Sequence, residues 1–115
     1  KIICVFGCGG DRDKTKRSKM GAIADQLADE SIITNDNPRS ESPEQIAQDI
    51  LVGVKNKNKF MVELDREKAI IKAIQSANQY DWILIAGKGH ETDQIIGNQA
   101  LHHSDVESVN RAIGA

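Results

Sequence analysis

The feature that most constrains the fold is a regular alternation of short apolar segments with segments of helical periodicity. Apolar or β-branched runs at 2–6, 31–34, 60–64 and 82–86 predict strands. Between them, apolar residues recur with the spacing of amphipathic helices at 20–27, 47–54 and 70–77, and a last helix is expected from Ser104 to Gly114. Strands that alternate with helices indicate an α/β fold: a three-layer, Rossmann-like domain with a mainly parallel sheet.

Capping residues support the predicted helix boundaries. Ser42, followed by a proline, opens the helix at 47–54, Asp65 can cap the helix at 70–77, and Ser104 begins a second capping box. Residues 94–96 are expected to form a short extra strand before the turn residues Gly97-Asn98. This strand leaves room for one antiparallel member in the sheet.

Length and charge restrict the class of protein. The chain has 115 residues, with 17 acidic against 15 basic side chains and a net charge of −2, which argues against nucleic acid as a partner. No apolar run approaches the roughly 20 residues that span a bilayer, so no membrane association is expected. Cys4 and Cys8 are expected to be packing residues in a reducing compartment, and a cytoplasmic location follows. Because Lys1 leads directly into an apolar strand, we expect a fragment cut at a domain boundary.

Three loops at 7–17, 35–41 and 87–91 follow predicted strands and should share the edge of the sheet where ligands of α/β proteins bind. The first loop begins with three glycines among its first four residues, and five basic and two acidic side chains follow between 11 and 19. It matches neither the dinucleotide fingerprint nor a P-loop. Its composition fits an anion site or a tight turn with a solvated basic flank.

The second and third loops carry side chains suited to a zwitterion. Asp36, Asn37 and Arg39 lie around a proline, either as an ordinary turn or as a rigid frame for a ligand with an ammonium and a carboxylate group. Gly87 and Glu91 follow the most apolar strand, where two glycines and three polar residues are hard to explain by packing alone. Binding is the favoured role for this third loop.

Other candidate residues are expected to be structural. His102 and His103 with Asp105 lack a further ligand at a spacing suited to a metal, and no metal site is expected. No nucleophile–base–acid order suggests a catalytic residue in this chain. Trp82 and Phe60 lie in strand runs and are expected in the core, with 82–86 as the most buried strand.

The three loops together resemble the C-terminal domain of the Mur ligases, ATP-dependent amide ligases of peptidoglycan synthesis. The resemblance covers essentially all 115 residues and rests on three motifs: Gly7-Cys8-Gly9-Gly10-Asp11-Arg12-Asp13-Lys14, Asp36-Asn37-Pro38-Arg39 and Gly87-Lys88-Gly89-His90-Glu91. The second motif is similar to that of members that add meso-diaminopimelate to UDP-MurNAc-L-Ala-D-Glu, whereas lysine-adding members differ there.

This resemblance implies a set of site residues. Asp11 would face the ATP ribose and Lys14 the nucleotide, while Arg39 and Arg12 would hold the distal carboxylate of diaminopimelate. The N-terminal UDP-binding domain, the central ATPase domain and the Mg²⁺ ligands would lie outside this chain, which alone should be inactive. The residues implied to bind diaminopimelate are Arg12, Asp36, Asn37, Pro38, Arg39, Gly87 and Glu91.

Three alternatives remain open at this point. The chain could be a stand-alone module that binds an amino acid or a nucleotide. It could be a weak nucleic-acid binder that uses residues 11–19, although its acidic balance and few aromatic residues speak against this. It could also be the same domain of another amide ligase, one that adds lysine or glutamate, such as folylpolyglutamate synthase.

Overall fold

The computed structural model describes residues 1–114 and contains a four-stranded parallel sheet with a separate β-hairpin. The sheet order is β3-β2-β1-β4, and β5 pairs with β6 in antiparallel register. The elements in chain order are β1 (Ile2–Phe6), α1 (Thr15–Leu27), β2 (Glu30–Ile33), α2 (Pro43–Leu51), the 3₁₀ turn η1 (Lys57–Lys59), β3 (Phe60–Val62), α3 (Arg66–Ser76), β4 (Trp82–Ile85), β5 (Asp93–Ile96), β6 (Gln99–His102) and α4 (Asp105–Ile113).

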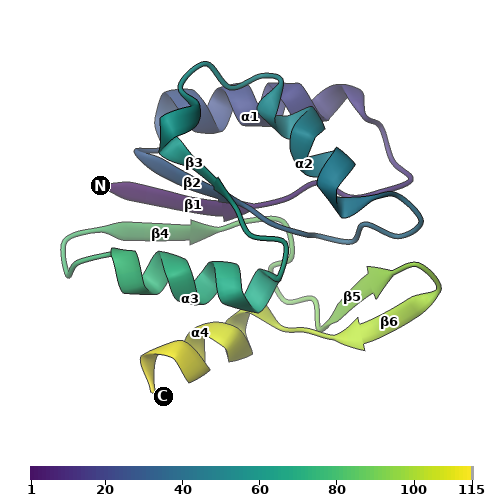
Figure 1. The fold of residues 1–115 in the computed structure, drawn as a ribbon. Helices are drawn as coiled ribbons and strands as arrows, with labels where there is room; N and C mark the ends of the chain where they lie inside the picture. Colours follow the sequence, from purple (N-terminus) through teal and green to yellow (C-terminus); the bar gives the residue numbers. More distant parts are fainter. Residues whose placement is uncertain (115) are drawn as a thin grey trace.

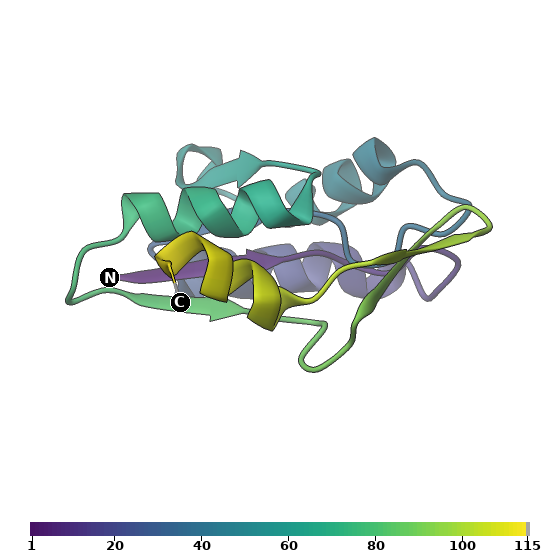
Figure 2. The same ribbon diagram turned by 90° about the horizontal axis from the view of Figure 1, so that it is seen from below.

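The helices lie in two layers around the sheet. Helices α1 and α2 cover one face, and α3 and α4 lie on the other face (Figures 1 and 2). The predicted three-layer α/β fold is therefore confirmed. The antiparallel pairing is confined to the hairpin, which lies beyond the carboxyl ends of the strands (Figure 1).

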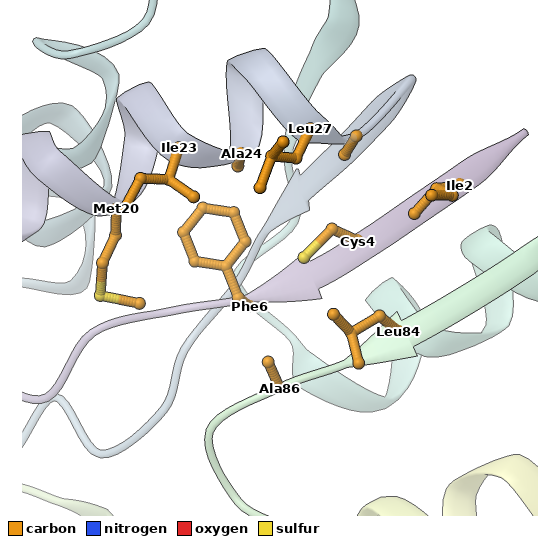
Figure 3. Close-up of a pocket in the computed structure, with 10 residues that line it drawn as sticks. Ile2, Cys4, Phe6, Met20, Ile23, Ala24, Leu27, Leu84 and Ala86 are labelled. Carbon is orange, nitrogen blue, oxygen red and sulfur yellow. The ribbon is translucent and has the colours of Figure 1, made fainter.

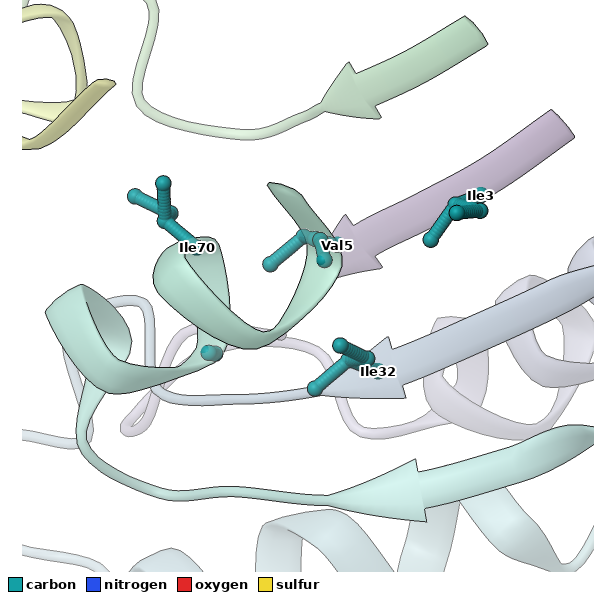
Figure 4. Packing of buried hydrophobic residues seen from close by; sticks show 6 residues of the cluster. Ile3, Val5, Ile32 and Ile70 are labelled. Atoms are coloured by element: carbon teal, nitrogen blue, oxygen red, sulfur yellow. The ribbon is translucent and has the colours of Figure 1, made fainter. Parts of the chain in front are cut away.

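Strand β1 supplies side chains to both halves of the core. Ile3 and Val5 point toward α3, where Ile70 is completely buried against them (Figure 4). Phe6 belongs to a second cluster, on the side of α2, together with Ile33. This alternation follows from the two-residue period of a strand and explains why a strand covered on both faces has a continuous apolar sequence.

The three predicted helix caps are confirmed. The side chains of Ser42, Asp65 and Ser104 each accept a hydrogen bond from the backbone N–H three residues later, at 3.3, 3.2 and 3.3 Å. Such a cap satisfies a donor that the first turn of a helix leaves without a backbone partner. The last helix ends at Gly114, whose φ of 77° places it in the left-handed region expected of a C-terminal glycine.

The strand predicted at 82–86 is present as β4 (Trp82–Ile85), but its predicted burial is wrong. Strand β4 lies at the edge of the sheet, and Trp82, expected in the core, is 76% exposed. Phe60 is half-buried and packs against the α2-side cluster. The apolar composition of β4 reflects a surface that no helix among residues 1–114 covers on the α1 side, rather than a central place in the sheet.

Helix α1 also differs from its prediction. It begins at Thr15, more than a turn earlier than the apolar periodicity indicated, and its contact with α2 is made at Gly21, where a β-carbon would lie 2.1 Å from the Ile50 carbonyl oxygen. The predicted apolar stripe lines an open groove of about 320 Å³ (Figure 3), and its Ala24 also packs against the α2-side cluster. The groove residues are Ile2, Cys4, Phe6, Met20, Ile23, Ala24, Leu27, Ala28, Leu84 and Ala86.

Both cysteines are free and pack as predicted. Cys4 lines the apolar groove, and the Cys8 thiol lies 3.4 Å from the sulfur of Met20. Burial raises the pKa of both thiols, which keeps them protonated and unreactive at neutral pH.

The hairpin confirms the short strand predicted at 94–96 and adds a partner that was not predicted. Gly97 has a φ of 60° in the turn between β5 and β6. Apart from this hairpin, the regular elements of the described residues are helices, one 3₁₀ turn and the strands of the parallel sheet, and none of these helices combines the length and apolarity needed to cross a membrane.

Candidate functional site

The three predicted loops converge at one edge of the sheet. They follow β1, β2 and β4, which are neighbours in the sheet, and the β5–β6 hairpin lies at the same edge (Figure 1). Because the carboxyl ends of parallel strands lie at a common edge of the sheet, residues far apart in sequence meet here. The first loop is shorter than predicted and covers 7–14, since α1 begins at Thr15.

The glycines of the first loop allow it to touch the second loop. A β-carbon on Gly7 would lie 2.0 Å from the Thr34 carbonyl oxygen, and one on Gly10 would lie 1.8 Å from that of Pro38. The Gly10 N–H donates to the Asn37 carbonyl at 2.7 Å. These contacts leave no room for a side chain, so the two loops form one packed unit.

Arg39 is held in an uncommon backbone conformation. Its φ is 51°, and the hairpin fixes it there through hydrogen bonds from Arg39 N–H to the Ile95 carbonyl at 3.1 Å and from Gly97 N–H to the Arg39 carbonyl at 2.6 Å. Its Nη1 donates to the carbonyls of Gly10 and Asn37 at 2.9 and 3.3 Å. The guanidinium is thereby positioned, and its other N–H groups have no hydrogen-bond partner among residues 1–114.

Arg39 and Arg12 differ from the other arginines in their ion pairs. Arg17, Arg66 and Arg111 each pair with an acidic side chain, whereas Arg12 and Arg39 pair with none among residues 1–114. Both approach Gly9, because a β-carbon there would lie 3.0 Å from Arg39 Nη1 and 3.6 Å from the Arg12 side chain. Two arginine side chains that meet at one glycine and form no ion pair in this part of the chain suit a carboxylate ligand.

An acidic group lies on the other side of the second loop. The Asp36 carboxylate lies 3.1 Å from Lys88 Nζ, and Glu91 lies 3.9 Å from the same nitrogen. Gly87 has a φ of 105°, and a β-carbon there would lie 3.6 Å from Asp36 Oδ2. Asp36, Gly87 and Glu91 are therefore brought together as predicted, and Lys88 joins them as a residue that the sequence analysis did not select.

Asn37 and Pro38 face the protein interior. Both are buried, and the Asn37 side-chain oxygen accepts from Lys88 Nζ and from Ile95 N–H, each at 2.9 Å. Gln94 donates its side-chain amide to the Asp36 carbonyl at 2.9 Å. The second loop is thus attached to the hairpin along its length, and contact of Asn37 or Pro38 with a ligand stays a prediction.

The two residues expected near a nucleotide both contact Glu41, Asp11 through its backbone N–H and Lys14 through its ammonium group. Asp11, with a φ of 54°, accepts from the Ser40 hydroxyl at 2.7 Å, and its own N–H donates to Glu41 at 2.6 Å. The ammonium group of Lys14 lies 3.2 Å from Glu41. Both predicted residues are exposed at the loop edge.

A buried arginine, Arg17, stabilises the first loop from the protein interior. Arg17, which the sequence analysis counted in the solvated basic flank, is 1% exposed and pairs with Glu41 at 2.7 Å and Asp49 at 2.9 Å. Its guanidinium, together with the Asp11 N–H, lowers the pKa of Glu41 from 4.5 to about 2. The basic flank therefore includes a structural ion pair.

A second buried arginine connects two of the site loops to α4. Arg66 donates to the carbonyls of Asn35 at 3.0 Å and Ala86 at 2.9 Å, and binds the Asp105 carboxylate with two hydrogen bonds of 2.8 Å. Burial opposes ionisation of Asp105, but the hydrogen bonds from Arg66 and His103 outweigh it and lower its pKa. His103 thus serves this network, and no cluster of three metal-binding side chains occurs within residues 1–114.

The apolar groove is unsuited to a charged amino acid. It is lined almost wholly by carbon and sulfur atoms, so a buried ammonium or carboxylate would lose its hydration without gaining partners. The loop edge offers unpaired guanidinium groups and carboxylates together, which makes it the candidate site.

Comparison with known proteins agrees with this arrangement of motifs. Residues 1–89 match the family model described as Mur ligase, glutamate ligase domain. The chain belongs to the Mur ligase family. The resemblance inferred from the three loops is therefore confirmed.

Relatives with high sequence identity are ligases that add diaminopimelate by name. The chain is 58% identical over 113 residues to the UDP-N-acetylmuramoyl-L-alanyl-D-glutamate–2,6-diaminopimelate ligase of Coxiella burnetii, and 51% identical over 113 residues to that of Thermosynechococcus vestitus. Each match covers 98% of this chain and 23% of the relative. A solved structure of such a ligase superposes with a TM-score of 0.94 at 41% identity, over 99% of this chain and 24% of that one. The Mur ligase domain described here thus spans about a quarter of the length of these relatives.

Proposed function

We propose that this chain is the amino-acid-binding domain of an ATP-dependent ligase that adds meso-diaminopimelate to UDP-MurNAc-L-Ala-D-Glu in the cytoplasm. The observation that carries the proposal is that the guanidinium groups of Arg12 and Arg39, which form no ion pair among residues 1–114, lie at the same sheet edge as the carboxylates of Asp36 and Glu91. The names of the relatives, which are diaminopimelate ligases, support the choice of substrate.

The distal end of diaminopimelate carries an ammonium and a carboxylate on one carbon, and the site offers a partner for each. Arg39, assisted by Arg12, would bind the carboxylate, and an arginine fork does so with two parallel hydrogen bonds. Asp36 and Glu91 would accept from the ammonium group, with the Gly87 backbone close by. Asn37 and Pro38 would hold these groups in place from the buried side.

In this reaction the domain would contribute mainly by positioning the amino-acid substrate. ATP supplies the activation of the dipeptide carboxylate, and the domain would present the free amine of diaminopimelate to it, so that proximity lowers the barrier. Mg²⁺, the UDP-linked dipeptide and the other domains would be bound outside this chain, and the chain alone would not catalyse the reaction.

Asp11 and Lys14 fit a nucleotide at the rim of the site. The Ser40 hydroxyl donates a hydrogen bond to the Asp11 carboxylate, which keeps acceptor capacity for the hydroxyl groups of a ribose. The Lys14 side chain is largely exposed, and its ammonium can reach a phosphate while remaining near Glu41. These assignments extend the proposal to ATP.

Titration of the isotope-labelled chain with meso-diaminopimelate, L-lysine and L-glutamate tests the amino-acid assignment. We expect diaminopimelate to shift the backbone amides of Arg12, Arg39, Gly87 and Glu91, and lysine and glutamate to do so weakly. Loss of one charged contact typically costs a few kcal/mol, so Arg39→Ala should remove the preference.

The variant Arg111→Ala is the matched control, because Arg111 is an exposed arginine that pairs with Glu67 on the α3–α4 surface. It should leave the titration unchanged. Equal responses to diaminopimelate and lysine would contradict the assignment, and a preference for glutamate would favour the domain of a glutamate-adding ligase.

A further inference from the structure

Lys88 is a buried cation whose burial demands an explanation. The residue is 2% exposed and its side chain is fully covered, although it lies in a loop between two glycines that are both exposed. Lysine is rarely buried to this extent, because its ammonium group loses its hydration and must regain hydrogen bonds and a counter-charge in the protein.

The partners of Lys88 all belong to the candidate site or to the strand attached to it. Its ammonium group donates to the Asn37 side-chain oxygen at 2.9 Å and to the Asp93 carbonyl at 3.1 Å. The carboxylates of Asp36 and Glu91 lie 3.1 and 3.9 Å away. Lys88 therefore joins the second loop, the third loop and β5 at a single point.

The same contacts set the charge of the acidic side of the site. Asp36 and Glu91 carry two negative charges, and Lys88 compensates one of them. What remains matches one ammonium group, while the ligand's carboxylate is left to Arg39 and Arg12. Without the buried cation, both carboxylates would face the ligand uncompensated, and they would favour a ligand end that carries an ammonium group and no carboxylate.

We propose that Lys88 is a specificity-determining positioning residue, which selects a ligand end bearing both an ammonium and a carboxylate group over an end bearing an ammonium group alone. The distal ends of diaminopimelate and lysine differ in this way. Lys88 acts through Asp36 and Asn37, because its buried ammonium group cannot reach the ligand. The inference rests on the function proposed above and adds a residue to it.

The test is the ratio of the dissociation constants of L-lysine and meso-diaminopimelate, measured by the same amide titration on the unaltered chain and on Lys88→Met. We expect the preference for diaminopimelate to fall about tenfold, the size expected when one unit charge is removed several ångströms from a ligand near a protein surface. If Lys88 had a purely structural role, its substitution would weaken the binding of both ligands alike and leave the ratio of the dissociation constants unchanged.

Two further variants separate charge from hydrogen bonding and from folding. Lys88→Gln keeps a donor for Asn37 and should lower the ratio as Lys88→Met does, provided that charge is the cause. Glu91→Gln alters an exposed side chain and removes a negative charge, so the preference for diaminopimelate should rise. This variant tests the charge balance even if the substitutions at Lys88 prevent folding, which the amide spectrum reports.

The outcomes distinguish this inference from the proposed function. If the unaltered chain prefers diaminopimelate and neither Lys88→Gln nor Glu91→Gln changes the ratio, the role of Lys88 is refuted and the proposed function stands. If the unaltered chain binds neither ligand or shows no preference, both proposals are refuted together.

Discussion

Substitution of Gly10 by alanine tests the packing of the first two site loops against each other. The new methyl group would lie 1.8 Å from the Pro38 carbonyl oxygen, about half of an ordinary van der Waals contact distance, so the backbones must separate. The φ of Gly10 lies outside the left-handed region, and the cost therefore comes from this contact and not from backbone strain.

The size of the effect follows from two contributions. Forcing apart well-packed groups costs about 1–3 kcal/mol, and loss of the hydrogen bond from Gly10 N–H to the Asn37 carbonyl adds about 0.5–1.5 kcal/mol. We expect a decrease of roughly 2–4 kcal/mol in the free energy of unfolding. With a slope of about 2 kcal/mol per molar urea, the midpoint of unfolding would fall by about 1–2 M.

The matched control is Gly9→Ala, one residue earlier in the same loop. A β-carbon there meets the end of the flexible Arg39 side chain at 3.0 Å and no backbone atom closer than 4.0 Å. We expect the free energy of unfolding to change by less than about 0.5 kcal/mol. Equal urea midpoints for the two variants would refute the conclusion that the loops are locked together at Gly10.

Three further predictions concern side chains that support the loops and helices. The pKa of Glu41 is lowered from 4.5 to about 2, so its ion pair with Arg17 stabilises the fold above pH 4.5, and this stabilisation is lost as the pH falls toward 2. The variant Glu41→Gln should therefore unfold at a lower urea concentration than the unaltered chain at pH 6, and its free energy of unfolding should fall less between pH 5 and pH 2. Asp105→Asn leaves Arg66 buried without a counter-charge and should cost about 3–5 kcal/mol in urea unfolding; a cost below 1 kcal/mol would contradict the buried pair. Ser42→Ala removes an N-cap and should lower the free energy of unfolding by about 1 kcal/mol, measured by thermal melting; an unchanged melting temperature would exclude a role for this cap.

The features that could be predicted from the sequence are those determined locally. The caps at Ser42, Asp65 and Ser104 depend on a side chain and a backbone group three residues apart, and each was predicted correctly. The gathering of Asp36, Gly87 and Glu91 was also predictable, because their loops follow parallel strands whose carboxyl ends share an edge.

Other features depend on the order of strands in space, which local sequence does not contain. The run at 82–86 has the composition of a central strand, yet β4 lies at an edge and exposes Trp82. Arg17 and Lys88 have the sequence context of solvated loop residues, and their burial results from acidic partners 24 and 52 residues away along the chain, Glu41 and Asp36. No periodicity or spacing signals a contact of this kind.

The hydrogen bonds of Arg66 also determine how the site responds to movement. By binding the carbonyls of Asn35 and Ala86 together with Asp105, this one side chain ties the ends of two strands to the first turn of α4 on the outer layer. A rotation of the whole domain would then carry the guanidinium and carboxylate groups of the site as a rigid body. The spacing between the groups that bind the ammonium and those that bind the carboxylate would be preserved during the motion, and only the distance of a bound ligand from groups outside this domain would change.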